Sequence, residues 1–346
     1  MHFPAVDGKT LSIGLLMAAS VLLYGASRMA VFALARPDGS NPGRRALAQW
    51  VPIAATAIAA ILWRSEDAQM QRHMASIAIS VVFGTSLACL SLVAGMATYL
   101  TPLHILPPSK KVWPFVLPVA LLTLMAGISG HLTWWHALML MALGGAIVAV
   151  WLDAPEGPEG PSENPPSGST AAWAMFAVVA MCAVGAILIV KGTLTSSDMS
   201  SHGSRMLSPG VLAATILSPL LVLPTLGTAS SVAQRGYPGR ALTALVGTVL
   251  LNLCVLLPII IFCWYFRQLG KFAGSIDFKA GWDAIHALPY DMAAWRIETV
   301  LLIVLGFAMI PVSMGRWVVG KLESTLLVFG YAVYVVVLAV YELLPL

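Results

Sequence analysis

The chain has 346 residues, of which 59% are hydrophobic and only 10% are charged, and its mean hydropathy is +0.86. A soluble domain carries about 25% charged residues, so this composition excludes a soluble enzyme and indicates a membrane protein with many spans. The net charge is +4, and the sequence contains no basic patch of the kind that binds nucleic acid. The lipid bilayer is therefore the expected partner, and no nucleic acid, cofactor or enzyme constellation is predicted.

Ten apolar runs have roughly the 20 residues that a helix needs to cross a bilayer. In chain order, the predicted spans cover residues 11–35, 47–63, 74–100, 112–128, 132–152, 171–190, 210–233, 241–266, 300–318 and 326–343. A spanning backbone must satisfy its own hydrogen bonds, which makes each run a helix. The polar stretch 267–296 is predicted to be a loop that covers a cavity mouth or lies along the membrane surface. No acidic residue lies securely inside a predicted span.

The stretch "DAPEGPEGPSENPPSGST", residues 153–170, is rich in Pro, Gly, Ser and acid, which is typical of a solvated linker. It separates two predicted repeats, residues 1–152 and 171–346, with five spans each. Because five is odd, the second repeat would be inverted in the membrane. The basic residues of the short loops predict that these loops lie inside and both termini outside; they are Arg36, Arg44, Arg45, Lys110, Lys111, Arg235, Arg240, Arg316 and Lys321. The expected location is a bacterial inner membrane.

The third and eighth spans align without a gap. "VVFGTSLACLSLVAG" (81–95) set beside "ALVGTVLLNLCVLLP" (244–258) pairs the two Gly-Thr dipeptides and pairs Cys89 with Asn252. The second span aligns with the seventh, and the first with the sixth, at a similar separation of roughly 160 residues. This agreement predicts an internal repeat.

These residues resemble the cation/calcium exchanger superfamily, the sodium/calcium antiporters. Each half of such an antiporter has an alpha-repeat with a G-T-S-L-P-E element followed by a G-N-x-x-G-S-N element. The better match lies in "SPGVLAATILSPLLVLPTLGTASSVAQRGYPGRALTALVGTVLLN", residues 208–252. The resemblance implies an all-helical membrane transporter of ten helices, built as two inverted-topology repeats of five, that exchanges cations by alternating access.

The resemblance also implies which positions would hold the ion ligands. In this sequence, acidic residues are missing from these positions. The ion-binding Glu of the family falls at Thr225, and its second ligand position, an Asn or Asp, falls at Asn252. In the first half, one alignment with the family motif puts Cys89 at the position of the ion-binding Glu. A second register, which keeps five spans per half, puts Cys89 at the Asn and Glu66 near the Glu; we interpret Glu66 as a loop residue.

The predicted midplane site is lined by Thr85, Ser86, Cys89, Thr225, Thr248 and Asn252, with Glu66 as a weaker candidate. Gly84, Pro224 and Gly247 are the candidate hinges, because breaks near the bilayer centre let carbonyls and hydroxyls face a cavity. Alternatively, the small residues only pack helices together and the hydroxyls bond the preceding turn.

A calcium ion needs six to eight oxygens, usually including several carboxylates, so the loss of the acids argues against calcium. Three hypotheses follow for the solute: a less demanding cation moved with sodium or proton coupling, a site completed by loop acids, or loss of transport. The alternative function is a non-transporting membrane scaffold or sensor that retains the exchanger fold. The sequence does not identify the transported solute.

Overall fold

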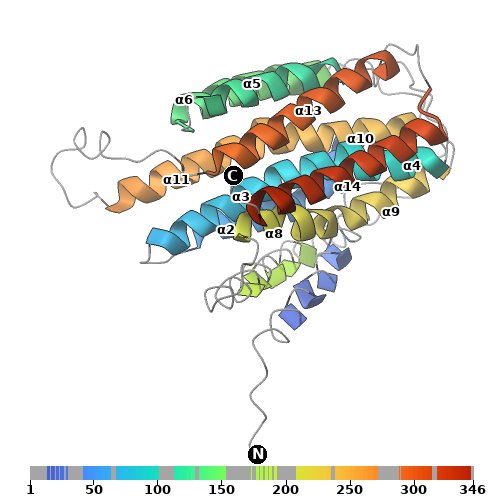
Figure 1. Ribbon diagram of the computed structural model, residues 1–346. Helices are drawn as coiled ribbons and strands as arrows, with labels where there is room; N and C mark the ends of the chain where they lie inside the picture. The colour runs from blue at the N-terminus through green and yellow to red at the C-terminus, as the bar shows by residue number, and fades with distance from the viewer. Residues whose placement is uncertain are drawn as a thin grey trace, which may run out of the picture.

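A computed structural model gives the fold (Figure 1). It describes residues 42–63, 68–100, 113–128, 132–152, 208–234, 238–271, 288, 290–313 and 318–343, with scattered positions in 14–29 and 173–192. All regular structure in these ranges is helical, and a single antiparallel bridge joins Leu132 to Leu288. The predicted first and sixth spans, and the linker, lie largely or wholly outside the described residues.

The helices follow the predicted spans closely. They are α2 (Pro42–Leu62), α3 (Ala68–Ala88), η1 (Cys89–Val93), α4 (Ala94–Leu100), η3 (Trp113–Phe115), α5 (Val116–Ile128), α6 (Trp134–Leu152), α8 (Pro209–Leu212), η4 (Ala213–Leu217), α9 (Ser218–Gln234), α10 (Pro238–Leu251), η5 (Asn252–Leu256), α11 (Leu257–Lys271), α13 (Met292–Ser313) and α14 (Lys321–Leu343). Two ends correct the predicted loop 267–296: α11 continues to Lys271, and α13 starts at Met292. These helix ends contain polar residues, so they do not belong to the apolar runs from which the spans were predicted.

Among the residues that the structure describes, six helical stretches are long and apolar enough to cross a membrane, and α5 and α6 are shorter apolar helices. The stretch 69–100 is 94% buried by protein, whereas 321–341 is only 22% buried. On α14, Leu322, Phe329 and Val336 are exposed and recur every seven residues, so they share one face. A continuous apolar face of this kind is what an integral membrane helix presents to lipid.

Three helices contain a π-helical segment, and prolines explain two of them. The segments η4 and η5 each end two residues before a proline, Pro219 and Pro258 respectively. A proline lacks the N–H that would bond the preceding turn, and its ring clashes with the carbonyl four residues back, which widens the helix there. The hydroxyl of Ser218 donates to the carbonyl of Ala213 at 2.9 Å, which satisfies part of the opened turn.

The helix α3 is the centre of the bundle (Figure 1). It packs against α2 from its own half and against α8, α9, η5 and α13 from the second half. At Gly84 the approach is close: a Cβ there would overlap Ser218 and would lie 3.1 Å from Cα of Ala214. Because glycine has no side chain, α3 and the α8–α9 segment can touch backbone to backbone.

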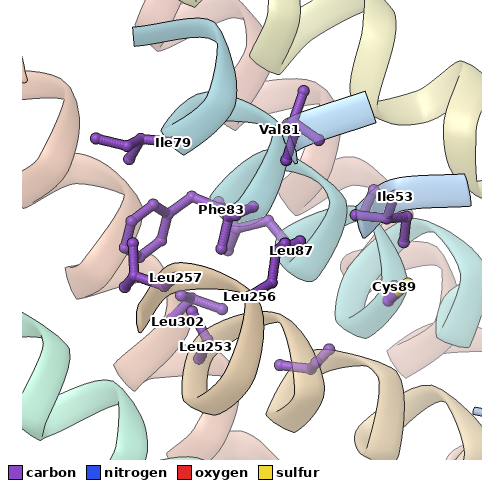
Figure 2. Packing of buried hydrophobic residues seen from close by; sticks show 14 of the residues in the cluster. Ile53, Ile79, Val81, Phe83, Leu87, Cys89, Leu253, Leu256, Leu257 and Leu302 are labelled. Carbon is purple, nitrogen blue, oxygen red and sulfur yellow. The ribbon is translucent and has the colours of Figure 1, made fainter. Parts of the chain in front are cut away.

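The apolar core joins α3 to the second half of the chain. Figure 2 shows side chains of α3 facing those of η5, α11 and α13: Phe83, Leu87, Leu253, Leu256, Leu257 and Leu302. Phe83 also meets the fully buried Trp295 edge to face, with ring centroids 4.6 Å apart. This packing holds the polar residues of α3 and η5 in register.

Two adjacent glycines of α6 offer a test of helix packing. A Cβ at Gly144 would lie 2.9 Å from Cβ of Cys254 in η5, whereas a Cβ at Gly145 would meet nothing within 4 Å. We expect Gly144→Ala to destabilise the protein by about 1–3 kcal/mol through overpacking. Gly145→Ala should be neutral or slightly stabilising, because alanine favours a helix. Thermal unfolding of both purified variants in detergent measures the difference; equal midpoints would contradict the α6–η5 contact.

Candidate functional site

A buried polar cluster, made of Thr85, Ser86 and Asn252, joins the two halves of the chain. The side-chain amide of Asn252 donates to Oγ1 of Thr85 and to Oγ of Ser86, each at 3.1 Å. All three residues are fully buried. Asn252 is the first residue of η5, so the cluster lies where the eighth predicted span changes from α- to π-helix. The structure therefore brings together three of the six predicted site residues, and we call them the Asn252 cluster.

The hydrogen bonds around the cluster fix the orientation of the amide. The hydroxyl of Thr85 donates to the carbonyl of Val81 at 2.6 Å, and that of Ser86 donates to the carbonyl of Val82 at 2.7 Å. Each hydroxyl has one hydrogen, so each must accept from Asn252, and Nδ2 must face them. Oδ1 is then buried without a hydrogen-bond partner among the described residues. An unpaired buried acceptor costs about 1–3 kcal/mol, so Oδ1 is an acceptor that a water molecule or an ion would satisfy.

A second polar group lies beside the first and was missed from the sequence. Nε2 of Gln49 in α2 donates to Thr228 in α9 at 3.1 Å, and Oε1 of Gln49 lies 3.2 Å from Oγ1 of Thr248 in α10. All three residues are buried. Thr248 thus belongs to this Gln49 cluster, whereas the sequence placed it with Asn252. The sequence feature that could have indicated this cluster was Gln49, a polar residue near the start of the apolar run 47–63.

The remaining predicted ligands differ in how the structure places them. Cys89 starts the π-helical segment η1 and is buried in the apolar core (Figure 2). Thr225 is buried in α9, and its carbonyl accepts a hydrogen bond from Thr228 at 3.0 Å. Glu66 lies outside the described residues. A ligand role for each of these three stays a prediction.

The candidate hinges lie inside continuous helix. Gly84 is within α3, Pro224 within α9 and Gly247 within α10. The irregular backbone comes five residues after each glycine, where η1 starts at Cys89 and η5 starts at Asn252. The two residues that the sequence alignment pairs thus occupy the same position in two π-helical segments. Such segments often mark functional sites in helices.

A fully buried acid lies inside a span, contrary to the sequence prediction. Glu298 is in α13, within the apolar stretch 294–312, and is fully buried. The hydroxyl of Tyr290 donates to its Oε2 at 2.7 Å, and that of Tyr334 donates to its Oε1 at 3.0 Å. Burial, followed by the charge of Glu298, raises the pKa of Tyr290 well above its usual range, so this phenol stays protonated. The sequence missed Glu298 because it lies two residues before the predicted span at Val300.

The site offers hard neutral oxygens to a cation. Hydroxyl and amide oxygens are ligands that sodium, calcium and similar ions accept. Within the described ranges, no group of three His, Cys, Asp or Glu side chains comes together as a metal site. The Asn252 and Gln49 clusters therefore have polarity without a negative charge of their own.

Comparisons with known proteins bear on the family and on the fold. Residues 175–340 match the family model described as "Sodium/calcium exchanger protein". No curated protein matches the chain. The resemblance to the cation/calcium exchanger superfamily is thus confirmed.

Two solved structures share the fold. A structure of the sodium-calcium exchanger NCX_Mj, soaked with 10 mM Na+ and zero Ca2+, superposes with a TM-score of 0.61 at 17% identity, and the match covers 95% of this chain and 99% of that one. The H+/Ca2+ exchanger CAX superposes with a TM-score of 0.67 at 13% identity, covering 96% of this chain and 86% of that one. Identities this low show a shared fold and leave the ligands to be argued from this chain.

The link between Gln49 and Thr248 can be measured with a double-mutant cycle. We expect Gln49→Leu and Thr248→Val to couple by about 0.5–1.5 kcal/mol in the free energy of unfolding, as one buried hydrogen bond would. Thr243 is the matched control, because it is also buried in α10 and bonds the carbonyl of Gly239 in its own helix at 2.8 Å. Denaturant titration of the purified variants measures both cycles. Equal coupling in the two cycles would show that Gln49 and Thr248 do not interact.

Proposed function

We propose that the chain, whose residues 175–340 match the sodium/calcium exchanger family, is an integral membrane cation exchanger that works by alternating access. The observation that carries the proposal is the Asn252 cluster. It joins the two halves through hydrogen bonds of 3.1 Å and leaves one buried amide oxygen without a partner among the residues that the structure describes. A cation is a natural partner for that oxygen, because a dehydrated cation needs oxygen ligands.

The proposed architecture has ten helices in two inverted repeats, residues 1–152 and 171–346, separated by the linker 153–170. The packing of the described helices supports it. The helix α2 packs against α3 and α10, and α9 likewise packs against α10 and α3. The fifth helix of the first half, α6, packs against α11, while the fifth of the second, α14, packs against α4. The two fourth helices, α5 and α13, pack against each other, which is compatible with a two-fold relation.

The proposed solute is a small cation of low charge, coupled to sodium or protons. The Asn252 and Gln49 clusters contain threonine, serine, glutamine and asparagine, and none of these balances two positive charges. Burying an uncompensated charge costs several kcal/mol even after relaxation. Calcium is therefore disfavoured. The proposal retains both termini outside and a bacterial inner membrane as the location.

Flux through proteoliposomes tests the proposal. Wild-type protein should move labelled sodium, potassium or rubidium down an imposed sodium or proton gradient. We expect Asn252→Ala to lower that flux roughly tenfold, which corresponds to ~1.4 kcal/mol, because it removes the amide from the cluster. Thr123→Val is the matched control, since Thr123 is buried in α5 and bonds the carbonyl of Ala120 in its own helix at 2.8 Å.

Each outcome separates one part of the proposal from another. If wild-type protein moves none of the ions tested, the scaffold or sensor function replaces transport. If transport persists unchanged in Asn252→Ala, the exchanger function stands and the site assignment is wrong. An equal loss in Thr123→Val would show that the effect comes from damage to the fold.

A further inference from the structure

We propose that Glu298, with Tyr290 and Tyr334, forms a buried proton-binding site separate from the Asn252 cluster. This inference rests on the proposed exchanger function, because it assigns the coupling ion to protons and gives them a residue. The three side chains come from α13, from the segment just before it and from α14. None of them belongs to the helices that carry the Asn252 and Gln49 clusters.

The charge balance around Glu298 favours a proton. Both carboxylate oxygens accept hydrogen bonds from phenols, at 2.7 and 3.0 Å. Of the described side chains, the titratable ones that influence Glu298 are Tyr290 and Tyr334, which donate to it, and the acid Asp291; Tyr331 of α14 also lies nearby. The helix α5, which packs against α13, contributes no titratable side chain. A carboxylate inside a membrane without a cationic partner is expensive and is a functional residue by default.

The oxygens around Glu298 suit a proton better than a metal ion. Both carboxylate oxygens of Glu298 already accept hydrogen bonds from phenols, and a single carboxylate would balance only one of the two charges of a calcium ion. The hydrogens of the phenols also point at the carboxylate, where a metal ion would have to displace them. A proton needs one oxygen and a hydrogen-bond partner, and both are present.

Serines of α3 provide a path toward this site. Oγ of Ser80 lies 3.5 Å from the hydroxyl of Tyr290. Arg72, Ser76 and Ser80 are four residues apart, so they lie on one face of α3. Their exposure falls along that face, since Arg72 is exposed, Ser76 is half-buried and Ser80 is buried. The face thus runs from the surface of the protein to Tyr290.

Proton binding changes the direction of the hydrogen bonds. When a proton binds Oε2 of Glu298, the new O–H donates to the oxygen of Tyr290. The hydroxyl hydrogen of Tyr290 then turns to Oγ of Ser80, which lies within reach. No bond other than O–H forms or breaks, and the site gains one positive charge. Ser80 is on α3, and its carbonyl oxygen lies 3.5 Å from Oγ of Ser218 in α9, so the rearrangement takes place beside the contact between α3 and α9.

Infrared difference spectroscopy of the purified protein across a pH series tests the site without any transport. Wild-type protein should show a carboxylic-acid C=O band whose intensity changes with pH. This band should be separate from the bands of the solvent-exposed carboxyl groups. Glu298→Gln should lose this band, and Tyr334→Phe, which keeps the ring but removes one donor, should shift it. Glu323→Gln is the control, because Glu323 accepts from the backbone N–H of Gly320 at the start of α14 and should leave the band unchanged.

A band that survives in Glu298→Gln would overturn the proposal. Should that variant fail to fold, an unshifted band in Tyr334→Phe would overturn it equally. In proteoliposomes with a pH-sensitive dye, Glu298→Gln should lose proton movement that accompanies cation flux. Wild-type protein that moves cations without protons would refute the coupling role while leaving the exchanger function intact. Loss of all transport in wild type, with the titrating band present, would refute the exchanger function alone.

Discussion

The structure depends on how polar side chains are satisfied inside a bundle that has little charge. A hydroxyl or amide within hydrocarbon must find a protein partner, because water is scarce there. Thr85 and Ser86 meet this need by bonding the preceding turn of α3 and by accepting the amide of Asn252 from η5. The bonded residues are 166 and 167 positions apart in the chain. These hydrogen bonds therefore connect the two halves next to the apolar contacts of Phe83 and Leu257.

Part of this arrangement could be predicted from the sequence. Apolar runs gave the positions of most described helices, since length and hydropathy determine what can cross a bilayer. The aligned Gly-Thr dipeptides and Asn252 indicated the polar cluster, because polar groups in apolar runs are rare. The pairing of Cys89 with Asn252 also agrees with the positions at which η1 and η5 begin. The partner of Thr248 could not be predicted, because no pattern in α2 indicates which face of Gln49's helix meets α10.

Glu298 shows where hydropathy fails. Its helix starts at Met292 with polar neighbours, so a search for apolar runs begins the span too late. What makes an acid acceptable there is tertiary: Tyr290 and Tyr334 reach it from outside its own helix. Sequence spacing does not show that contact. The same limit applies to the glycines, because a Cβ added at Gly144 would overlap Cys254 while one added at its neighbour Gly145 would meet none of the described residues.

The π-helical segment η5 has a consequence for chain length. A π turn accommodates a residue that a regular α-helix would not, so everything after Leu256 is rotated relative to Asn252. Removing one residue from this turn would advance the following helix by about 100° around its axis. The face of α11 that now meets α6 would then turn away from it. Insertions and deletions, even of small apolar residues, are therefore far less tolerable here than exchanges of one apolar side chain for another.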